Sequence, residues 1–263
     1  MITRFCFTET DDMQNELNPA GTAPLGNLKV VPETESPAGT AHLVHMNNDL
    51  AAVINIKSFV TPIQSHPLED DRNRAVKRGI DILVSFIFIA AVLSWLIPLM
   101  AVLIKLDSKG PVFFLQKRNK RRGELFSCIK FRSMRSNVDA DILPAGRNDI
   151  RITKLGKFLR KHYLDELPQF FNVLWGDMSI IGPRPHMVSE NIKYDGLIKN
   201  YNSRHKVKPG ITGLAQAMGY VGETDNAHKM KTRVDMDIFY IRHWSFRLDM
   251  IILYRTLRKS VGL

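Results

Sequence analysis

The sequence has little cysteine and lacks the common nucleotide-binding signatures. Only Cys6 and Cys128 occur among 263 residues, so nothing indicates a disulfide framework or an oxidising compartment. The chain has no GxGxxG followed by an acidic ribose contact, no Walker loop and no evident internal repeat. It does not open with a cationic stretch followed by an apolar one, so we expect no secretory signal.

Charge is distributed unevenly along the chain. Residues 1–71 contain 3 Lys or Arg and 10 Asp or Glu, whereas residues 72–263 contain 34 and 16, and the whole chain carries a net charge of +11. We predict that the acidic, turn-rich segment 1–71 is disordered or weakly folded. The basic remainder indicates an anionic partner, which could be anionic lipid, a phosphorylated substrate or nucleic acid.

A hydrophobic run follows the acidic segment. Residues 82–104 include no charged side chain over 23 positions, and such a helix would measure ~35 Å against a bilayer core of ~30 Å. Pro98 interrupts the run, and the hydroxyl of Ser94 one turn earlier could satisfy freed backbone groups. Both flanks are basic, whereas a spanning helix shows positive charge mainly on one side. We therefore predict a basic flank and re-entrant membrane helix over 72–105, broken at Ser94 and Pro98, with a spanning helix as the alternative.

Two short strands are predicted after the hydrophobic run. Residues 111–118 and 124–134 are rich in apolar and aromatic residues, and Gly123 between them favours a turn. We expect a small β-hairpin. Cys128 lies where apolar and polar residues roughly alternate, so we expect it to be a buried strand residue rather than a redox group.

Two amphipathic helices are predicted further along. Leu155, Phe158 and Leu159 share one helical face opposite basic residues, which fits either a helix in the membrane interface or an ordinary surface helix. Residues 239–257 mix apolar residues with arginines and indicate an interfacial or core-facing helix. The expected fold class is α+β, mainly helical with a small β-hairpin, with a re-entrant membrane helix and interfacial amphipathic helices.

The adjacent carboxylates Asp165 and Glu166 are the main candidates for chemistry. Neighbours on a helix point ~100° apart, so the two groups should take different tasks, and Pro168 should stop or kink the helix that holds them. Basic residues crowd the pair: Lys154, Lys157, Arg160, Lys161, His162 and Arg184. This setting suits a divalent metal and a polyphosphate, with one carboxylate free to attack phosphorus. The alternative is a pair of salt bridges at a helix end.

Two glycine–proline turns follow. Prolines 183 and 185 enclose Arg184, which lowers the entropy that its guanidinium loses when it grips a phosphate. Residues 208–213, KPGITG, form a second turn with a cation, whose backbone amides could cradle an anion.

Several motifs in fixed order identify a family resemblance. They are KLDSKGPVFF (105–114), KFRSM (130–134), RITKLGKFLRK (151–161), LDELPQFFNVLWGDMSIIGPRP (164–185) and VKPGITGLAQ (207–216). From Arg78 onward the chain resembles the bacterial sugar transferases, also called monotopic phosphoglycosyl transferases, over about 185 of 263 residues. The stretch 219–250 is similar to the undecaprenyl-phosphate glucose phosphotransferases.

The resemblance implies a reaction and a set of residues. Asp165 would attack the phosphate attached to the sugar of a UDP-sugar, UMP would leave, and undecaprenyl phosphate would then displace Asp165. Glu166 would help to hold Mg²⁺ or manage a proton, so Asp165 and Glu166 are the expected catalytic and metal-binding residues. The expected phosphate- and nucleotide-binding residues are Lys130, Arg132, Arg160, Arg184 and Lys208.

The resemblance also implies partners and a location. We expect UDP-glucose or UDP-galactose as donor, contact with membrane lipids, and a cytoplasmic catalytic domain at 106–263 on the bacterial inner membrane. The product would enter exopolysaccharide, capsule or O-antigen synthesis at its first membrane step. We expect no nucleic acid, because acidic residues in such a site would repel phosphate, while the chain could form an oligomer. The alternative function is a catalytically silent membrane-tethered scaffold or an anionic-ligand-binding module.

Overall fold

The computed structural model describes residues 63–135, 146, 149–222 and 227–260. The chain divides into two compact units, 1–53 and 54–263, and all described residues belong to the second. Most of the acidic segment 1–71 therefore lies outside the described residues. Its last part contains a short 3₁₀ turn, Pro67–Glu69, and the side chain of Asp70 then caps the next helix by accepting from the amides of Arg72 and Asn73.

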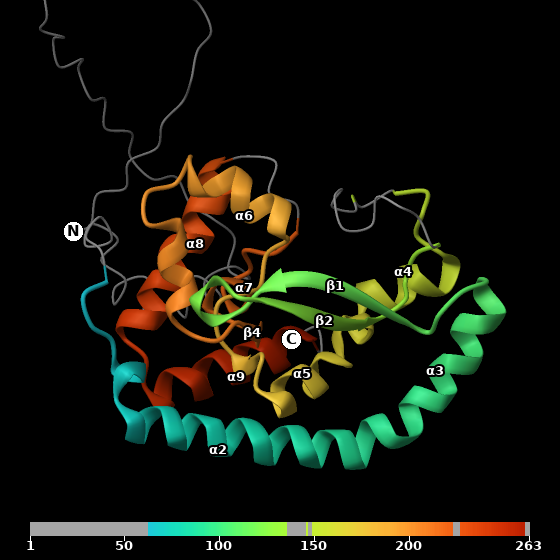
Figure 1. Ribbon diagram of the computed structural model, residues 1–263. Coiled ribbons are helices and arrows are strands. Elements are labelled where there is room, and N and C mark those ends of the chain that lie inside the picture. Colours follow the sequence, from blue (N-terminus) through green and yellow to red (C-terminus); the bar gives the residue numbers. More distant parts are fainter. Residues whose placement is uncertain (1–62, 136–145, 147–148, 223–226, 261–263) are drawn as a thin grey trace, which may run out of the picture. The chain divides into compact units, whose positions relative to one another are not determined.

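One long helix carries the hydrophobic run. It comprises α2 (Asp71–Phe88), a π-helical turn (Ile89–Leu93) and α3 (Ser94–Asp107). The 37 residues form a continuous helix whose most apolar stretch has a mean hydropathy of 2.7, so it is long and apolar enough to cross a membrane. In Figure 1, α2 runs below the other labelled elements and α3 turns upward beside the β1–β2 hairpin.

The bend in this helix falls where the sequence predicted a break. The π-helical turn ends just before Ser94, whose hydroxyl donates to the carbonyl of Ala90 at 2.7 Å. Pro98 lies inside α3 and cannot donate to the carbonyl one turn before it. Both π-helical turns and prolines bend helices. The helix therefore continues through Ser94 and Pro98 instead of ending there.

The predicted hairpin is confirmed. Strands β1 (Phe113–Asn119) and β2 (Leu125–Phe131) pair antiparallel, with Phe113 opposite Phe131 and Asn119 opposite Leu125. Gly123 has a positive φ of 77° in the turn, and Cys128 is buried in β2 as expected. A second sheet was not predicted: β3 (Ser179–Ile181) pairs parallel with β4 (Gly210–Thr212).

Six further helices complete the described part of the second unit. They are α4 (Lys154–Lys161), α5 (Gln169–Trp175), α6 (Val188–Asp195), α7 (Leu214–Ala217), α8 (Ala227–Arg242) and α9 (Phe246–Ser260). The prediction of one helix over 239–257 was wrong, because α8 ends at Arg242 and α9 begins at Phe246. The hydroxyl of Ser245 accepts from the amide of Leu248 at 3.2 Å, so this serine starts a new helix as its N-cap.

The inner face of the π-helical turn and α3 packs on the domain. Leu93, Leu96, Met100 and Ile104 form a buried cluster with Phe131 of β2 and Leu159 of α4. The predicted amphipathic helix at 154–161 thus packs its apolar residue Leu159 inward, while Phe158 stays exposed. The exposed large apolar side chains of α2 and α3 are Val76, Ile82, Leu83, Val84, Phe86, Ile87, Trp95, Leu99, Val102, Leu103 and Leu106.

Polar contacts hold α2 to the same domain. Lys77 forms an ion pair with Asp249 of α9 at 2.7 Å. Arg78 donates to the last carbonyls of α5, at Val173 and Leu174. The hydroxyl of Ser179 and the amide of Ile180, both in β3, donate to the carboxylate of Asp81. Two of the basic residues before the hydrophobic run are therefore used inside the protein.

Candidate active site

The two glycine–proline motifs lie against each other through the parallel sheet. The amide of Gly182 donates to the carbonyl of Thr212 at 2.9 Å, and the amide of Gly210 donates to the carbonyl of Pro183 at 2.9 Å. A Cβ on Gly210 would lie 2.2 Å from the nitrogen of Gly182, so only glycine permits this approach. The pairing fixes Arg184 just after β3. The amide of Gly210 is engaged, so it does not contribute to the anion cradle expected at 208–213.

Asp165 and Glu166 lie in a tight turn between two helices. Helix α4 ends at Lys161, a 3₁₀ turn covers Leu164–Glu166, and α5 begins at Gln169 after Pro168. The expected interruption at Pro168 is confirmed, although the preceding helix ends earlier than expected. Both carboxylates are buried. Their turn follows the C-terminal end of α4 and contacts β2.

Glu166 is held by two cations from different elements. Lys130, near the end of β2, donates to Oε1 at 3.0 Å. Arg184 donates to both carboxylate oxygens, with 3.0 Å between Nη1 and Oε2, which is the bidentate geometry that orients a carboxylate most firmly. Burial by itself would raise the pKa of Glu166, but the charges of Arg184 and Lys130 outweigh it and hold that pKa below the ordinary glutamate value. Glu166 is therefore ionised and fixed.

Asp165 has a different environment. Within the described part of the chain, its side chain makes no hydrogen bond and no ion pair. Burial, followed by the negative charge of Glu166, raises the pKa of Asp165, while Lys130 and Arg160 act in the opposite direction without cancelling the rise. Glu166 is thus held by two cations, whereas Asp165 makes no hydrogen bond within the described residues. This difference agrees with the prediction that the two carboxylates take different tasks.

The structure brings three of the five predicted phosphate-binding residues together. Lys130 and Arg184 contact Glu166, and the charge of Arg160 acts on Asp165. Arg160 is otherwise in contact with the sulfur of Met134 at 3.8 Å. Lys130 and Arg184 thus contact the carboxylate pair directly, and Arg160 acts on it through its charge.

The other two predicted residues lie elsewhere. Arg132 is buried and donates to the carbonyls of Ile104 and Ser108, so it caps the C-terminal end of α3. Its predicted contact with phosphate has no support in this geometry. Lys208 lines a separate cavity together with Arg78 and Arg121, and neither Asp165 nor Glu166 lines that cavity.

A buried polar network behind Arg184 was missed by sequence reasoning. Arg204 donates to Asp237 at 2.7 Å and to the main-chain oxygen of Arg184 at 2.6 Å. It also contacts His186, which in turn lies 2.8 Å from the hydroxyl of Tyr201. Burial, and then the charge of Arg204, lowers the pKa of His186 well below its ordinary value, so this histidine is neutral. These residues lie far apart in the sequence and follow no recognisable spacing.

The fold and the site together define a class of protein that combines a buried carboxylate pair, cations in contact with it and a long apolar helix. The chain belongs to the bacterial sugar transferase family, whose model matches residues 72–262. This membership was the resemblance that the motifs predicted.

Several curated relatives match most of the described domain. The chain is 50% identical over 202 residues to a UDP-glucose:undecaprenyl-phosphate glucose-1-phosphate transferase of Klebsiella pneumoniae, covering 76% of this chain and 43% of the relative. A protein of the same name from Caulobacter vibrioides is 41% identical over 181 residues, covering 68% of this chain and 67% of the relative. A UDP-N-acetylgalactosamine-undecaprenyl-phosphate N-acetylgalactosaminephosphotransferase of Aeromonas hydrophila is 44% identical over 185 residues, covering 70% of this chain and 43% of the relative. The chain thus spans less than half the length of some of the relatives it matches.

Proposed function

We propose that the protein transfers a sugar 1-phosphate from a UDP-sugar to undecaprenyl phosphate and releases UMP. The observation that carries this proposal is the contrast within the carboxylate pair: Asp165 is buried and uncommitted, while Arg184 and Lys130 hold Glu166. The donor is UDP-glucose or UDP-galactose. The names of several relatives support UDP-glucose, and the Aeromonas hydrophila relative shows that a closely similar domain occurs in a protein named for an N-acetylated sugar.

In the first step, an ionised oxygen of Asp165 attacks the phosphorus next to the sugar. A new O–P bond forms to Asp165, the bond from that phosphorus to the bridging diphosphate oxygen breaks, and UMP leaves with the bonding electrons. The product is a phosphosugar–aspartyl intermediate. Lys130, Arg160 and Arg184 neutralise the charge that spreads over the phosphate oxygens, which is the main demand of phosphoryl transfer.

In the second step, undecaprenyl phosphate releases the enzyme. An oxygen of the lipid phosphate attacks the same phosphorus, the O–P bond to Asp165 breaks, and the aspartate is regenerated as the undecaprenyl diphosphate sugar leaves. Glu166 keeps Arg184 in place through both steps, because its two oxygens fix both nitrogens of the guanidinium fork.

Mg²⁺ is the cofactor expected from the chemistry, and the residues fit it in part. Mg²⁺ usually binds through one or two carboxylates together with substrate phosphates, and among the described residues no cluster of three or more His, Cys, Asp or Glu could bind a metal without substrate. The carboxylate oxygens of Asp165 are available as metal ligands, whereas those of Glu166 already accept hydrogen bonds from Lys130 and Arg184. Asp165 would therefore hold the ion together with the donor diphosphate, and bound Mg²⁺ would neutralise charge on that diphosphate.

The long helix supports a re-entrant arrangement. Its first part is tied to the domain through Lys77 and Arg78, and its last part packs on β2 and α4 through Met100 and Ile104. A helix that crossed a bilayer could not have both ends in contact with one domain on one side. We therefore propose that the outer apolar face of α2 and α3 enters the membrane without crossing it. The exposed stripe of Phe246, Met250, Tyr254 and Leu257 on α9 supports an interfacial position for that helix.

This arrangement would place the domain on the cytoplasmic side of the bacterial inner membrane. There a soluble nucleotide sugar and a lipid-borne acceptor can meet, and the reaction would be the first membrane step of exopolysaccharide, capsule or O-antigen synthesis. The alternative is a silent scaffold or an anionic-ligand-binding module of the same machinery. Under that alternative the protein would need no free carboxylate, whereas Asp165 provides one.

The test is UMP release from a panel of UDP-sugars by the full chain in the presence of undecaprenyl phosphate and Mg²⁺. Release from one donor that is lost in Asp165→Asn would support the reaction, the donor and the residue together. The matched control is Asp177→Asn, because Asp177 is a carboxylate that pairs with Lys120 outside the site. No release from any donor by folded protein would favour the scaffold.

A further inference from the structure

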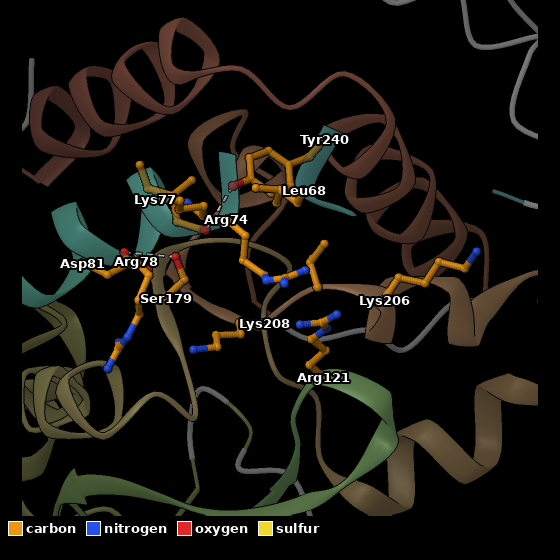
Figure 2. A pocket seen from close by; sticks show the side chains of 12 residues that line it. Leu68, Arg74, Lys77, Arg78, Asp81, Arg121, Ser179, Lys206, Lys208 and Tyr240 are labelled. Atoms are coloured by element: carbon orange, nitrogen blue, oxygen red, sulfur yellow. Dashed lines mark hydrogen bonds between the residues drawn. The ribbon is translucent and has the colours of Figure 1, made fainter. Parts of the chain in front are cut away.

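A second group of cations lies away from the catalytic pair. A cavity of about 50 Å³ is lined by α2, by the turn of the β1–β2 hairpin and by the segment before β4. Figure 2 shows the side chains that line it. Its cationic lining residues are Arg74, Lys77, Arg78, Arg121, Lys206 and Lys208, against one carboxylate, Asp81. The cavity therefore has a large excess of positive charge.

Two of these cations have no partner in the part of the chain that the structure describes. Neither Lys208 nor Arg121 makes a hydrogen bond or an ion pair there. A Cβ on Gly176 would lie 3.4 Å from both the Lys208 ammonium and an Arg78 nitrogen, so these two cations converge over the glycine. Burial, followed by the like charge of Arg78, lowers the pKa of Lys208. Like charges gathered in a half-buried place are costly unless an anion joins them.

The carboxylates nearby do not meet this need. Asp81 accepts from the hydroxyl of Ser179 and the amide of Ile180, which direct one of its oxygens toward β3. Asp249 forms an ion pair with Lys77, and Asp177 forms one with Lys120. The positive charge of Lys208 and Arg121 is thus left for a ligand, whereas Arg78 already donates to the carbonyls of Val173 and Leu174.

The size and position of the cavity limit what that ligand is. A water needs roughly 10–15 Å³ of such space, so about 50 Å³ admits a group of a few heavy atoms, such as a phosphate, and is too small to enclose a whole nucleotide. The lining residues of α2 lie just before the uncharged run that begins at Ile82. A membrane that received that run would bring its headgroups to the level of the cavity.

We propose that this cavity is a second anion site, separate from Asp165, that binds a phosphate group through Lys208 and Arg121, beside Arg78. The phosphate is a monoester or inorganic phosphate, carried either by a lipid headgroup or by a soluble ion. The site does not depend on the proposed transfer reaction, because none of these three residues contacts the carboxylate pair.

The experiment measures thermal unfolding of the full chain in nanodiscs. Ligand that binds the folded state raises the unfolding midpoint. One arm adds inorganic phosphate to phosphatidylcholine nanodiscs at constant ionic strength, and the other compares phosphatidylcholine with phosphatidylcholine containing phosphatidic acid. The variants are Lys208→Gln and Arg121→Gln. Lys199→Gln is the control for a surface lysine, and Arg184→Gln removes the phosphate-binding cation of the catalytic pair.

We expect one of the two ligands to raise the midpoint of the native chain, Lys199→Gln and Arg184→Gln, and this rise to be lost in Lys208→Gln and Arg121→Gln. A rise with inorganic phosphate identifies a soluble ligand, and a rise with phosphatidic acid alone identifies a headgroup. The proposal is overturned if neither ligand raises the midpoint, if Lys208→Gln and Arg121→Gln keep the rise, or if only Arg184→Gln loses it.

Discussion

The guanidinium of Arg204 donates a hydrogen bond of 2.6 Å to the main-chain oxygen of Arg184. Arg204 is also paired with Asp237 of α8 at 2.7 Å, and both side chains are almost fully buried. Arg184 in turn holds Glu166. Helix α8 is thereby connected to the carboxylate pair through two arginines, although it contributes no side chain to the pair itself.

This connection makes Arg204 a positioning residue. In Arg204→Lys the charge stays but the planar fork is lost, so one ammonium must replace a guanidinium whose Nη2 donates to Asp237 and to the carbonyl of Arg184 while its Nη1 contacts His186. We expect kcat to fall by roughly 10- to 100-fold, as for small misplacements of catalytic groups, with a smaller change in KM. Steady-state UMP release measures both. Arg247→Lys, on the exposed side of α9, is the control, and equal kcat in Arg204→Lys and native protein would contradict the role.

The pH dependence of the reaction should follow the ionisation of the Asp165 carboxyl group. This aspartate must be ionised to attack, and its pKa is raised by burial and then by Glu166, while the charge of Arg160 lowers it. Removing that charge in Arg160→Gln should raise the pKa further. The acidic limb of kcat/KM should therefore move to higher pH, because this limb follows the free enzyme. Lys161→Gln removes the adjacent exposed charge and should leave the limb in place; a limb unmoved in Arg160→Gln would refute the assignment.

His205 should make the fold sensitive to mild acid. Burial, and then the neighbouring charge of Arg204, lowers its pKa from 6.5 to about 4. The folded state therefore binds fewer protons than the unfolded state between these values, so this group adds stability above pH 6.5 that is lost as the pH falls toward 4. In His205→Gln the unfolding midpoint should decline less over this range. His228→Gln, at an exposed position, should decline like the native protein, and identical curves for all three proteins would exclude His205.

The re-entrant arrangement predicts that both ends of the long helix face the same side. Arg72 lies exposed in the first turn of this helix, and Lys109 lies exposed just beyond its last residue. Single cysteines at these positions, in a chain with Cys6 changed to serine, should react with a membrane-impermeant maleimide from the same side of sealed vesicles. Cys128 is 1% exposed and should stay unmodified in the folded protein. Reaction from opposite sides would establish a spanning helix.

Local patterns in the sequence were sufficient for much of this fold. Alternating residues around Gly123 gave the hairpin, and the uncharged run gave the long helix, because both depend on neighbours in the chain. Arg132 has contacts that such reasoning did not predict. It follows Lys130 in one motif, yet β2 ends at Phe131, and the arginine beyond it turns to the carbonyls at the end of α3.

The parts that the sequence did not predict depend on contacts between distant segments. The parallel pairing of β3 with β4 joins two glycine-rich turns that are separated by α6, and neither three-residue strand has a pattern of its own. The bond from Arg204 to Arg184 likewise joins residues 20 positions apart, through a main-chain oxygen that no side-chain pattern reveals. Within the site, the sequence predicted the pair Asp165 and Glu166 and different tasks for its members, whereas the contacts that hold Glu166 and leave Asp165 without a hydrogen bond in the described part of the chain required the structure.

The most direct measurement is intact-protein and peptide mass spectrometry after incubation with the UDP-sugar and Mg²⁺ but without undecaprenyl phosphate. Without an acceptor, the intermediate should accumulate as one added hexose phosphate on the peptide that contains Asp165. The adduct should disappear when undecaprenyl phosphate is added, and it should be absent from Asp165→Asn. An adduct on another residue, or UMP release that persists in Asp165→Asn, would contradict the account.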